Sequence, residues 1–215
     1  IWPFFNLIRP IRTVGRENIP DGPAVICPNH TTIGDPFYVV FAFGRHYPMR
    51  AMAKIQIMRV PFIGWILSKA GVFGVDRGHA DMKAVKTALK FLKDGNKLLM
   101  FPEGTRVHEG EDVSAKTGAA MFATRTGAPL LPVYVQQKKR LFRRNVVVIG
   151  EPFHPQFEGR KPTTDELDAI TGGCARLAAL ARYRDYGELA AETDRMRHLV
   201  AHILESERPT LGNIL

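Results

Sequence analysis

A histidine and a carboxylate follow the first strongly apolar run of the chain. The run 24–26 leads into His30, and Asp35 comes five residues later with two threonines and a glycine between. Neighbours on one face of a helix are three or four residues apart, so this spacing excludes a shared regular helix face. The pair instead predicts a strand, a turn that carries the histidine, and then a helix. An imidazole oriented by a carboxylate is a general base.

Two starts are possible for the helix that follows the turn. Thr32 can be the N-cap with Asp35 at N3 in a capping box. Alternatively, Asp35 caps the helix and Pro36 takes N1. Either start places the carboxylate near the imidazole at the end of a strand. An isolated pair of this kind is typical of a turn histidine with a satisfied hydrogen bond, so its function depends on the surrounding residues.

The residues around the histidine narrow what it could activate. No Gly-x-Ser-x-Gly elbow is present. Cys27 lies three residues before His30, but residues at that spacing across a strand end point to opposite faces, and a small cysteine in an apolar strand is a core residue. The simplest substrate of the base is therefore a hydroxyl or a water. A positioned base contributes about 10²–10⁴-fold to the rate.

Three further predicted strands also end in residues suited to anion binding. Lys54 follows 49–53, Arg77 follows 72–75, and an acid, two small residues and an arginine follow 97–101. Arginine can contact phosphate in a bidentate manner, lysine can add a point charge, and amides without bulky side chains can form an oxyanion site. Each residue alone is typical of a solvated turn. Their shared position predicts a site formed with His30 by Lys54, Arg77, Glu103, Gly104, Thr105 and Arg106.

The elements that position these residues alternate between strands and helices. Helices are predicted at 79–92 and 116–126, and a buried helix or strand at 36–44. Further strands are predicted at 129–135 and 146–149. This order predicts an α/β fold with one mixed, largely parallel sheet flanked by helices. Ligands of such sheets bind beyond the carboxyl ends of the strands, where the candidate residues fall.

Three segments have unusual compositions. Residues 1–11 mix aromatic and aliphatic side chains with arginine and proline, which indicates either an interfacial segment on a membrane or a terminus packed on the domain. Residues 58–67, of helix length, are apolar enough to line a pocket, to dip into lipid, or to be ordinary core. The basic run 138–144 contains no acid, and it could contact anionic lipid, bind the phosphates of coenzyme A, or be a solvated hairpin.

The composition limits the class of protein. The chain has 215 residues and a formal charge of +9, which together indicate one folded domain with an anionic partner. Two cysteines provide neither a disulfide framework nor zinc spacing, so we expect a reducing compartment and no metal site. No run reaches the roughly 18 apolar residues of a spanning helix. The sequence begins at Ile1 and leaves open an anchor before it.

The predicted organisation has three parts. Residues 1–16 form the interfacial segment, 17–162 form the α/β domain, and 163–215 form a C-terminal helical hairpin packed on that domain. The hairpin is inferred from two apolar stripes, one starting at Leu167 and one at Met196, separated by a break at 183–187.

Four blocks resemble the glycerolipid acyltransferase family. Residues 29–35 have its Asn-His-x₄-Asp form, and 101–106 (Phe-Pro-Glu-Gly-Thr-Arg) resemble its second hallmark. Residues 71–78 are similar to its arginine-bearing block, and 128–133 to its proline-containing strand. Residues 116–119 also resemble the family's Lys-x-Gly-Ala. Because the blocks occur in the family's order, the resemblance is far more specific than one short motif.

The resemblance implies transfer of an acyl chain from acyl-CoA or acyl carrier protein to the hydroxyl of a lysophospholipid. The common acceptor is 1-acylglycerol 3-phosphate, which gives phosphatidic acid for phospholipid biosynthesis, with no cofactor. By position, His30 is the base and Asp35 orients it, while Lys54 and Arg77 hold the acceptor phosphate. Residues 103–106 complete acceptor binding and the oxyanion site. A peripheral membrane enzyme on the cytoplasmic face of an anionic membrane is expected.

Two departures from the family pattern limit how far the family's residue roles apply to this sequence. Residues 54–57 read Lys-Ile-Gln-Ile where the family often has Lys-x-Glu-Leu, and 163–205 exceed the family's usual tail. The alternatives are another acceptor (glycerol 3-phosphate or a different lysophospholipid), a thioester hydrolase that uses water, and a basic nucleic-acid-binding module. No recognised nucleic-acid-binding motif occurs, so we expect no nucleic-acid partner. Acyl length, donor carrier and oligomeric state are not encoded in recognisable residues.

Overall fold

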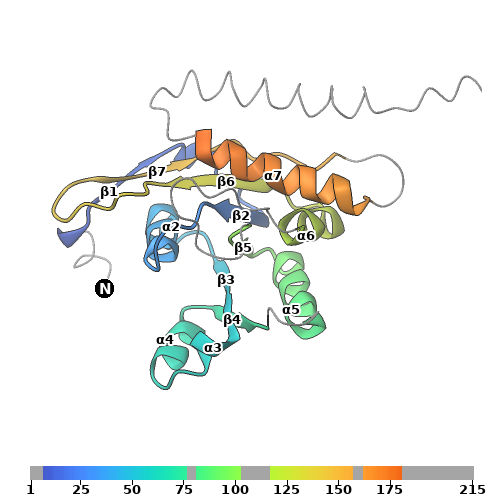
Figure 1. Ribbon diagram of the computed structural model, residues 1–215, viewed down its shortest axis with the longest axis horizontal. Helices are drawn as coiled ribbons and strands as arrows, with labels where there is room; N and C mark the ends of the chain where they lie inside the picture. The colour runs from blue at the N-terminus through green and yellow to red at the C-terminus, as the bar shows by residue number, and fades with distance from the viewer. Residues whose placement is uncertain (1–6, 77–80, 103–116, 157–161, 181–215) are drawn as a thin grey trace, which may run out of the picture.

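The protein is built on one seven-stranded sheet, seen in a computed structural model that describes residues 7–76, 81–102, 117–156 and 162–180. Five neighbouring strands run parallel, and the remaining two run in the opposite direction, so the predicted mixed, largely parallel sheet is confirmed (Figure 1). In spatial order the strands are β1 (Ile11–Val14), β7 (Asn145–Ile149), β6 (Leu130–Val135), β2 (Ala24–Pro28), β5 (Lys97–Leu99), β3 (Met49–Lys54) and β4 (Val72–Val75).

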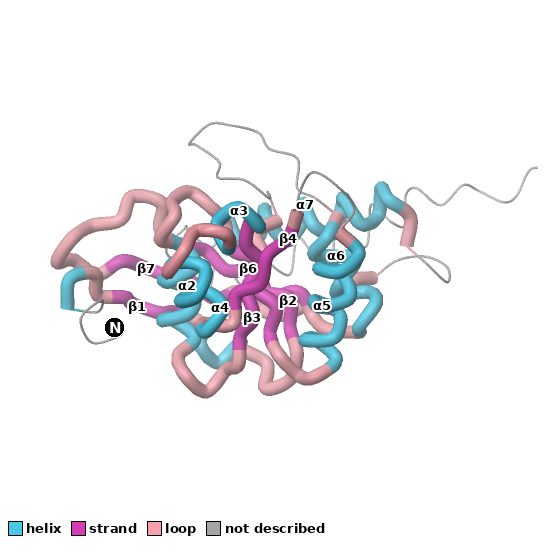
Figure 2. The backbone as a smooth tube through the Cα atoms, turned by 90° about the horizontal axis from the view of Figure 1, so that it is seen from below, coloured by secondary structure: helices cyan, strands magenta, loops and turns pink. Residues whose placement is uncertain are grey.

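Helices cover both faces of the sheet, and the covering follows from alternation along the central strand β2. Val25 and Cys27 point into a core shared with α5 (Met82–Lys93), α6 (Gly118–Thr126) and α7 (Thr164–Leu180). Ile26 points the other way, into a core shared with α2 (Asp35–Phe43). Because successive strand side chains face opposite sides, a β2 that is apolar at every position is buried on both. Figure 2 shows α2 and α5 on either side of the central strands.

The histidine junction forms as a strand, a turn and a helix, but neither predicted helix start is observed. Helix α2 begins at Asp35 itself, with Gly34 as N-cap and Pro36 in the first turn. Asp35 accepts from the Thr32 amide as in a capping box, yet the Thr32 hydroxyl donates to Asp35. The carboxylate therefore points back into the turn, where it orders the residues around His30.

The segment 58–67 is not the helix that its length predicts. It divides into α3 (Ile55–Met58) and α4 (Ile63–Lys69), joined by a turn through Phe62, whose φ is 65°. A Cβ at Gly64 would lie 2.0 Å from the carbonyl oxygen of Met58, so only glycine lets α4 return this close to α3. Five of its large apolar residues are exposed, and ordinary core is therefore wrong for this segment: Val60, Phe62, Ile63, Trp65 and Ile66.

The structure departs from the prediction at one end of the chain and agrees with it at the other. Residues 11–14, which the sequence places in an interfacial segment, form edge strand β1 alongside β7. At the other end, α7 confirms the first helix of the C-terminal extension, and its Ile170 and Cys174 are buried against the sheet. The second helix of the predicted hairpin lies outside the described residues. Among the described residues, no helix has the length and hydrophobicity needed to cross a bilayer.

The carboxyl ends of the parallel strands meet at one edge of the sheet. Ile26 of β2, Leu99 of β5 and Ala51 of β3 lie in register across three neighbouring strands. His30 and Lys54 lie four and three residues beyond that line, so they share this edge, two strands apart. Strands are spaced about 4.8 Å apart, which separates the two positions by roughly 10 Å across the sheet. We call this side of the molecule the catalytic edge and the opposite side the amino edge.

Candidate active site

The Asp35 carboxylate is the centre of a dense polar network and is completely buried. Its Oδ2 accepts hydrogen bonds from the backbone amides of Thr31 (2.6 Å) and Thr32 (2.7 Å). Its Oδ1 accepts from the Thr32 hydroxyl at 2.7 Å. A buried carboxylate is costly unless its oxygens are fully hydrogen bonded, and these donors meet that need. They also fix the orientation of the carboxylate within the turn.

His30 is oriented by this carboxylate. Its Nδ1 lies 3.2 Å from Asp35 Oδ2, while its side chain keeps 17% of its surface exposed. An ionised carboxylate can only accept a hydrogen bond, so Nδ1 carries a proton, and in the neutral ring Nε2 then carries the lone pair. The ring of Phe101 stacks on the imidazole, with centroids 4.0 Å apart. Imidazole and carboxylate thus have the arrangement of a general base and its orienting group.

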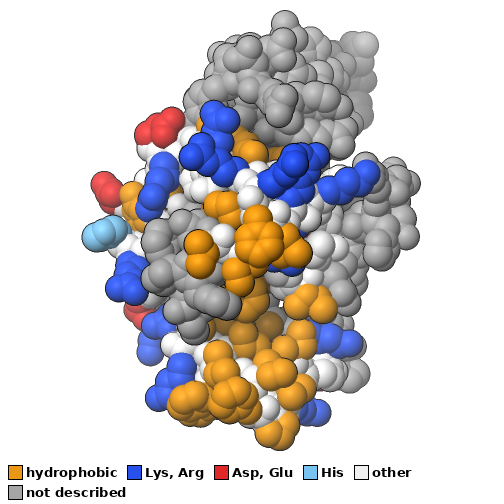
Figure 3. Space-filling model, turned by 90° about the vertical axis from the view of Figure 1, so that its left-hand side faces the viewer, with side chains coloured by type: hydrophobic (Ala, Val, Ile, Leu, Met, Phe, Trp, Pro, Cys, Tyr) orange, Lys and Arg blue, Asp and Glu red, His pale blue; other side chains and the backbone are white. Residues whose placement is uncertain are grey.

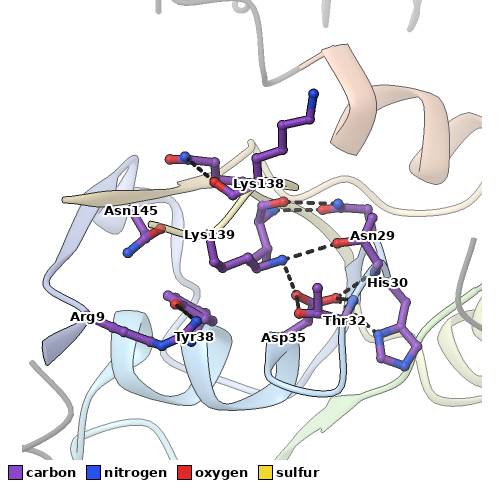
Figure 4. A network of polar contacts seen from close by, with 12 residues as sticks. Arg9, Asn29, His30, Thr32, Asp35, Tyr38, Lys138, Lys139 and Asn145 are labelled. Atoms are coloured by element: carbon purple, nitrogen blue, oxygen red, sulfur yellow. Dashed lines mark hydrogen bonds and ion pairs between the residues drawn. The ribbon is translucent and has the colours of Figure 1, made fainter. Parts of the chain in front are cut away.

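A lysine from a distant part of the chain completes the network. The Nζ of Lys139 donates to Asp35 Oδ1 in a very short ion pair and to the Thr31 hydroxyl at 3.1 Å. Its side chain is 5% exposed and lies over the ring of Tyr38, whose hydroxyl accepts from Arg9 at 3.3 Å. Figure 4 shows Lys139 approaching Asp35 from the side opposite His30. The carboxylate therefore bridges an ammonium group and an imidazole.

The charges in the network depend on these contacts. Burial raises the pKa of Asp35, but the hydrogen bonds from His30, Lys139 and Thr32 outweigh burial and hold the pKa well below its usual range. Burial lowers the pKa of the Lys139 ammonium group, and the hydrogen bond to Asp35 opposes that change. Asp35 is consequently ionised throughout the physiological pH range and can anchor the Nδ1 proton of His30.

Asn29 holds the junction against the neighbouring strand. Its side chain donates to the Val135 carbonyl at 3.0 Å and accepts from the Val135 amide at 2.7 Å. The side-chain amide therefore imitates one more residue of strand pairing between β2 and β6 (Figure 4). These two hydrogen bonds keep Asn29, the residue before His30, at a fixed place on the catalytic edge.

The other residues predicted for the site divide into two groups. Lys54 ends β3 on the catalytic edge, and its side chain is exposed there. Five lie outside the described residues, so their placement stays a prediction: Arg77, Glu103, Gly104, Thr105 and Arg106. Pro102, which precedes the last four of them, is buried three residues beyond the end of β5, which stops at Leu99 and not at Phe101 as the sequence predicts.

Sequence reasoning missed Lys139 and the stacking role of Phe101. Lys139 stands in a run of exposed basic residues, and it lies 104 positions from Asp35. One clue was available in the sequence, because the connection between the strands predicted at 129–135 and 146–149 is shorter than a crossover between parallel strands requires, so these two strands run antiparallel and the connection turns at the edge where the first strand ends. Phe101 was predicted as the end of a buried strand and as the first residue of the 101–106 block, with no contact to His30.

Comparison with known proteins identifies the family. A family model described as Acyltransferase matches residues 10–136. The 1-acyl-sn-glycerol-3-phosphate acyltransferase of Bacillus subtilis is 33% identical over 170 residues, which cover 75% of this chain and 82% of that protein. The protein of that name from Borreliella burgdorferi is 31% identical over 64% of this chain and 55% of its own. The protein of that name from Pseudomonas aeruginosa is 33% identical over 55% of this chain and 46% of its own.

A solved structure shares the fold. The crystal structure of a 1-acyl-sn-glycerophosphate acyltransferase from Thermotoga maritima matches with a TM-score of 0.56 and 24% identity, covering 81% of this chain and 74% of that one. The chain spans about half the length of the Borreliella and Pseudomonas relatives, and most of the Bacillus one. These matches confirm the resemblance drawn from the four sequence blocks. Since the family model covers more than half of the chain, the protein belongs to the Acyltransferase family of enzymes.

Proposed function

We propose that this enzyme transfers a fatty acyl chain from acyl-CoA or acyl carrier protein to the free hydroxyl of 1-acylglycerol 3-phosphate, giving phosphatidic acid. The observation that carries the proposal is the His30–Asp35 pair, which presents a base with a defined tautomer at the catalytic edge of an acyltransferase fold. The names of the Bacillus, Borreliella and Pseudomonas relatives support this choice of acceptor.

The reaction uses His30 as a general base. Nε2 takes the proton of the acceptor hydroxyl while the hydroxyl oxygen attacks the thioester carbonyl carbon. Collapse of the tetrahedral intermediate forms the ester, breaks the carbon–sulfur bond, and releases the thiolate, which takes the proton back from the imidazolium. Asp35 stabilises the imidazolium between these steps. No serine or cysteine of the enzyme has to be acylated, which agrees with the burial of Cys27 in the core.

The remaining predicted residues bind charge in this proposal. Lys54 holds the acceptor phosphate from the end of β3, together with Arg77. Glu103, Gly104, Thr105 and Arg106 complete the acceptor and oxyanion environment. All of them follow strands that end at the catalytic edge in the sheet order of the protein.

An assay of the whole protein tests the proposal. The enzyme is incubated with acyl-CoA or acyl carrier protein and with a panel of acceptors: 1-acylglycerol 3-phosphate, glycerol 3-phosphate, a lysophospholipid with a larger head group, and monoacylglycerol. We expect mass spectrometry to detect phosphatidic acid as the main product and little product from monoacylglycerol, which lacks the phosphate. Release of free thiol without dependence on any acceptor would instead indicate a hydrolase.

The substrates are lipids, and we propose that the exposed α3–α4 unit rests on the membrane that contains them. Phe62 and Trp65 are 73% and 60% exposed, and their rings stack with centroids 6.4 Å apart. Figure 3 shows hydrophobic side chains gathered on one face toward the α3–α4 end of the molecule, with lysine and arginine side chains around them. Aromatic residues beside cations suit the interface of an anionic bilayer. Because α3 directly follows Lys54, this contact would bring the catalytic edge to the lipid.

Vesicle co-sedimentation tests the membrane contact. We expect the wild-type protein to sediment with phosphatidylcholine vesicles that contain phosphatidylglycerol, and the variant F62S/W65S to bind at least several-fold more weakly. Met82 is also highly exposed, at 57%, but it starts α5 away from this unit, so M82S is the matched control. Equal binding by F62S/W65S and wild type would place the lipid contact elsewhere.

A further inference from the structure

The loop between β6 and β7 is held from within and delivers Lys139 to a fixed place. Gln136 donates to the Lys138 carbonyl at 2.8 Å and accepts from the Val146 amide at 3.0 Å. The buried Asn145 accepts from the Arg140 amide at 2.7 Å and donates to the Arg140 carbonyl at 2.9 Å. The residues on both sides of Lys139 are thus bonded to strand ends, which distinguishes this loop from a solvated basic hairpin.

The side chain of Lys139 is buried, although the residues on either side of it are exposed. Lys138 and Arg140 are exposed, and Figure 4 shows the Lys138 side chain pointing away from Asp35. Burying an ammonium group is costly unless an anion and further acceptors receive it. Asp35 and Thr31 receive it here. The position of Lys139 is therefore determined by the catalytic carboxylate.

One carboxylate serves two partners, the imidazole of His30 and the ammonium group of Lys139. Asp35 contacts His30 through Oδ2 and Lys139 through Oδ1. A carboxylate that faced only an imidazole would favour the imidazolium strongly. Here the ammonium group offsets the charge of the carboxylate and repels a positive imidazole, so the charge of Lys139 opposes the addition of a proton to His30.

We propose that Lys139 is a positioning residue of the acyltransferase site: it fixes Asp35 and sets the pH range in which His30 can act as a base. The inference rests on the proposed role of His30. In the part of the chain that the structure describes, the charged groups around His30 and Lys139 include Asp35 from α2 and Arg9 from the segment before β1, whose positive charge acts on Lys139. Phe101 contributes an uncharged ring from the side of β5.

The pH dependence of kcat/KM for wild type, K139M, K139R and K138M tests the proposal. We expect the acid limb of K139M to move to higher pH by about 0.5–1 unit, as expected for loss of one unit charge a few ångströms away in a partly solvated site. K139R keeps the charge and should keep the limb of the wild type. K138M removes an adjacent, exposed charge and should also leave the limb in place.

Two further measurements separate the possible failures. The titration midpoint of the His30 ring, followed by NMR, should move in the same direction in K139M and does not require activity. If the wild type lacks transferase activity but this midpoint moves, the proposed function fails and the inference about charge stands. A limb and a midpoint that stay in place while K139M is folded would overturn the inference. If K139M does not fold, N145A loosens the loop with Lys139 still present; a smaller shift of the same sign supports the proposal, and an unmoved limb overturns it.

Discussion

Lys97 and Lys139 are buried lysines at opposite edges of the same sheet. At the amino edge, Lys97 begins β5 and donates to the Gly22 carbonyl at 2.8 Å, with its ammonium group 4.9 Å from the centre of the Tyr47 ring. At the catalytic edge, Lys139 pairs with the Asp35 carboxylate, which also contacts His30. Burial lowers the pKa of both ammonium groups.

The difference between the two lysines lies in their hydrogen-bond acceptors, since the exposed Asp21 carboxylate acts on Lys97 through its charge without a hydrogen bond. A carbonyl oxygen and an aromatic ring stabilise an ammonium group but do not couple its charge to a second titratable group. A carboxylate can couple two titratable groups, because its interaction with one of them weakens its effect on the other. Burial of a lysine such as Lys97 therefore indicates only a packed polar contact. Burial of Lys139 against the carboxylate that orients His30 instead couples the β6–β7 loop to the proposed base. The following variants test this distinction, from the largest effect to the smallest.

Removing the imidazole at the catalytic edge should have the largest effect. We expect H30A to lower kcat by about 10²–10⁴-fold, since a positioned base contributes that much to proton transfer. The secondary structure and the melting temperature should stay close to those of the wild type, because the side chain of His30 is partly exposed. Steady-state acyl transfer and circular dichroism measure the two effects.

His46 provides the control for this variant. It is exposed in the loop that precedes β3, at the amino edge, and H46A should retain the activity of the wild type. An H30A enzyme that works within a few-fold of the wild type would remove His30 from the role of base.

Removing the lysine at the amino edge should affect stability alone. We expect K97M to lower the free energy of unfolding by about 1–3 kcal/mol, because the charged hydrogen bond from Lys97 to the Gly22 carbonyl is lost. The acid limb of kcat/KM should stay where the wild type has it. Urea denaturation measures the first quantity, and K90M, at an exposed position of α5, should change it by less than about 0.5 kcal/mol. A shifted limb in K97M would mean that the two lysines do not differ as described.

Acid should reveal the smallest effect. The folded pKa of Asp35 lies below its usual range, so the folded state binds this proton less readily than the unfolded state, whose carboxyl titrates near about 4. Its contribution to stability is present above that pH and is lost as the pH falls below it, by up to about 1.4 kcal/mol per pH unit.

The variant D35N should show a shallower decline of stability between about pH 4 and pH 2.5. Its stability at neutral pH should also be lower, because Lys139 stays buried without an anion. D21N, at an exposed position of the amino edge, should retain the steeper decline of the wild type. Identical slopes for D35N and wild type would show that Asp35 is not the group that titrates.

Local spacing was enough to predict the centre of the site. The five-residue spacing from His30 to Asp35 requires a turn, and the apolar runs before Lys54 and Pro102 predict strands, so the residues that follow them were expected to meet at one edge. These inferences succeed because each depends on a short stretch of backbone whose geometry its own residues dictate.

Long-range contacts and tight turns were not predictable in this way. Lys139 resembles its exposed neighbours, and only the tertiary fold gives it an anion. The segment 58–67 has the apolar content of a helix, but Pro61 and the positive φ of Phe62 interrupt it. Strand β1 was hidden because a short edge strand needs its partner β7, more than 130 residues away, to be recognised.

The reversed direction of β1 and β7 has a consequence for how the enzyme could be modified. Because these two strands run against the other five, the β6–β7 loop and the segment before β1 both arrive at the catalytic edge, where Phe142 donates to the Ile8 carbonyl at 2.7 Å. Both lie outside the parallel strands that carry His30 and Lys54. Exchange of this pair of segments between relatives would be a modular way to change the working pH of an acyltransferase while its catalytic strands stay unaltered.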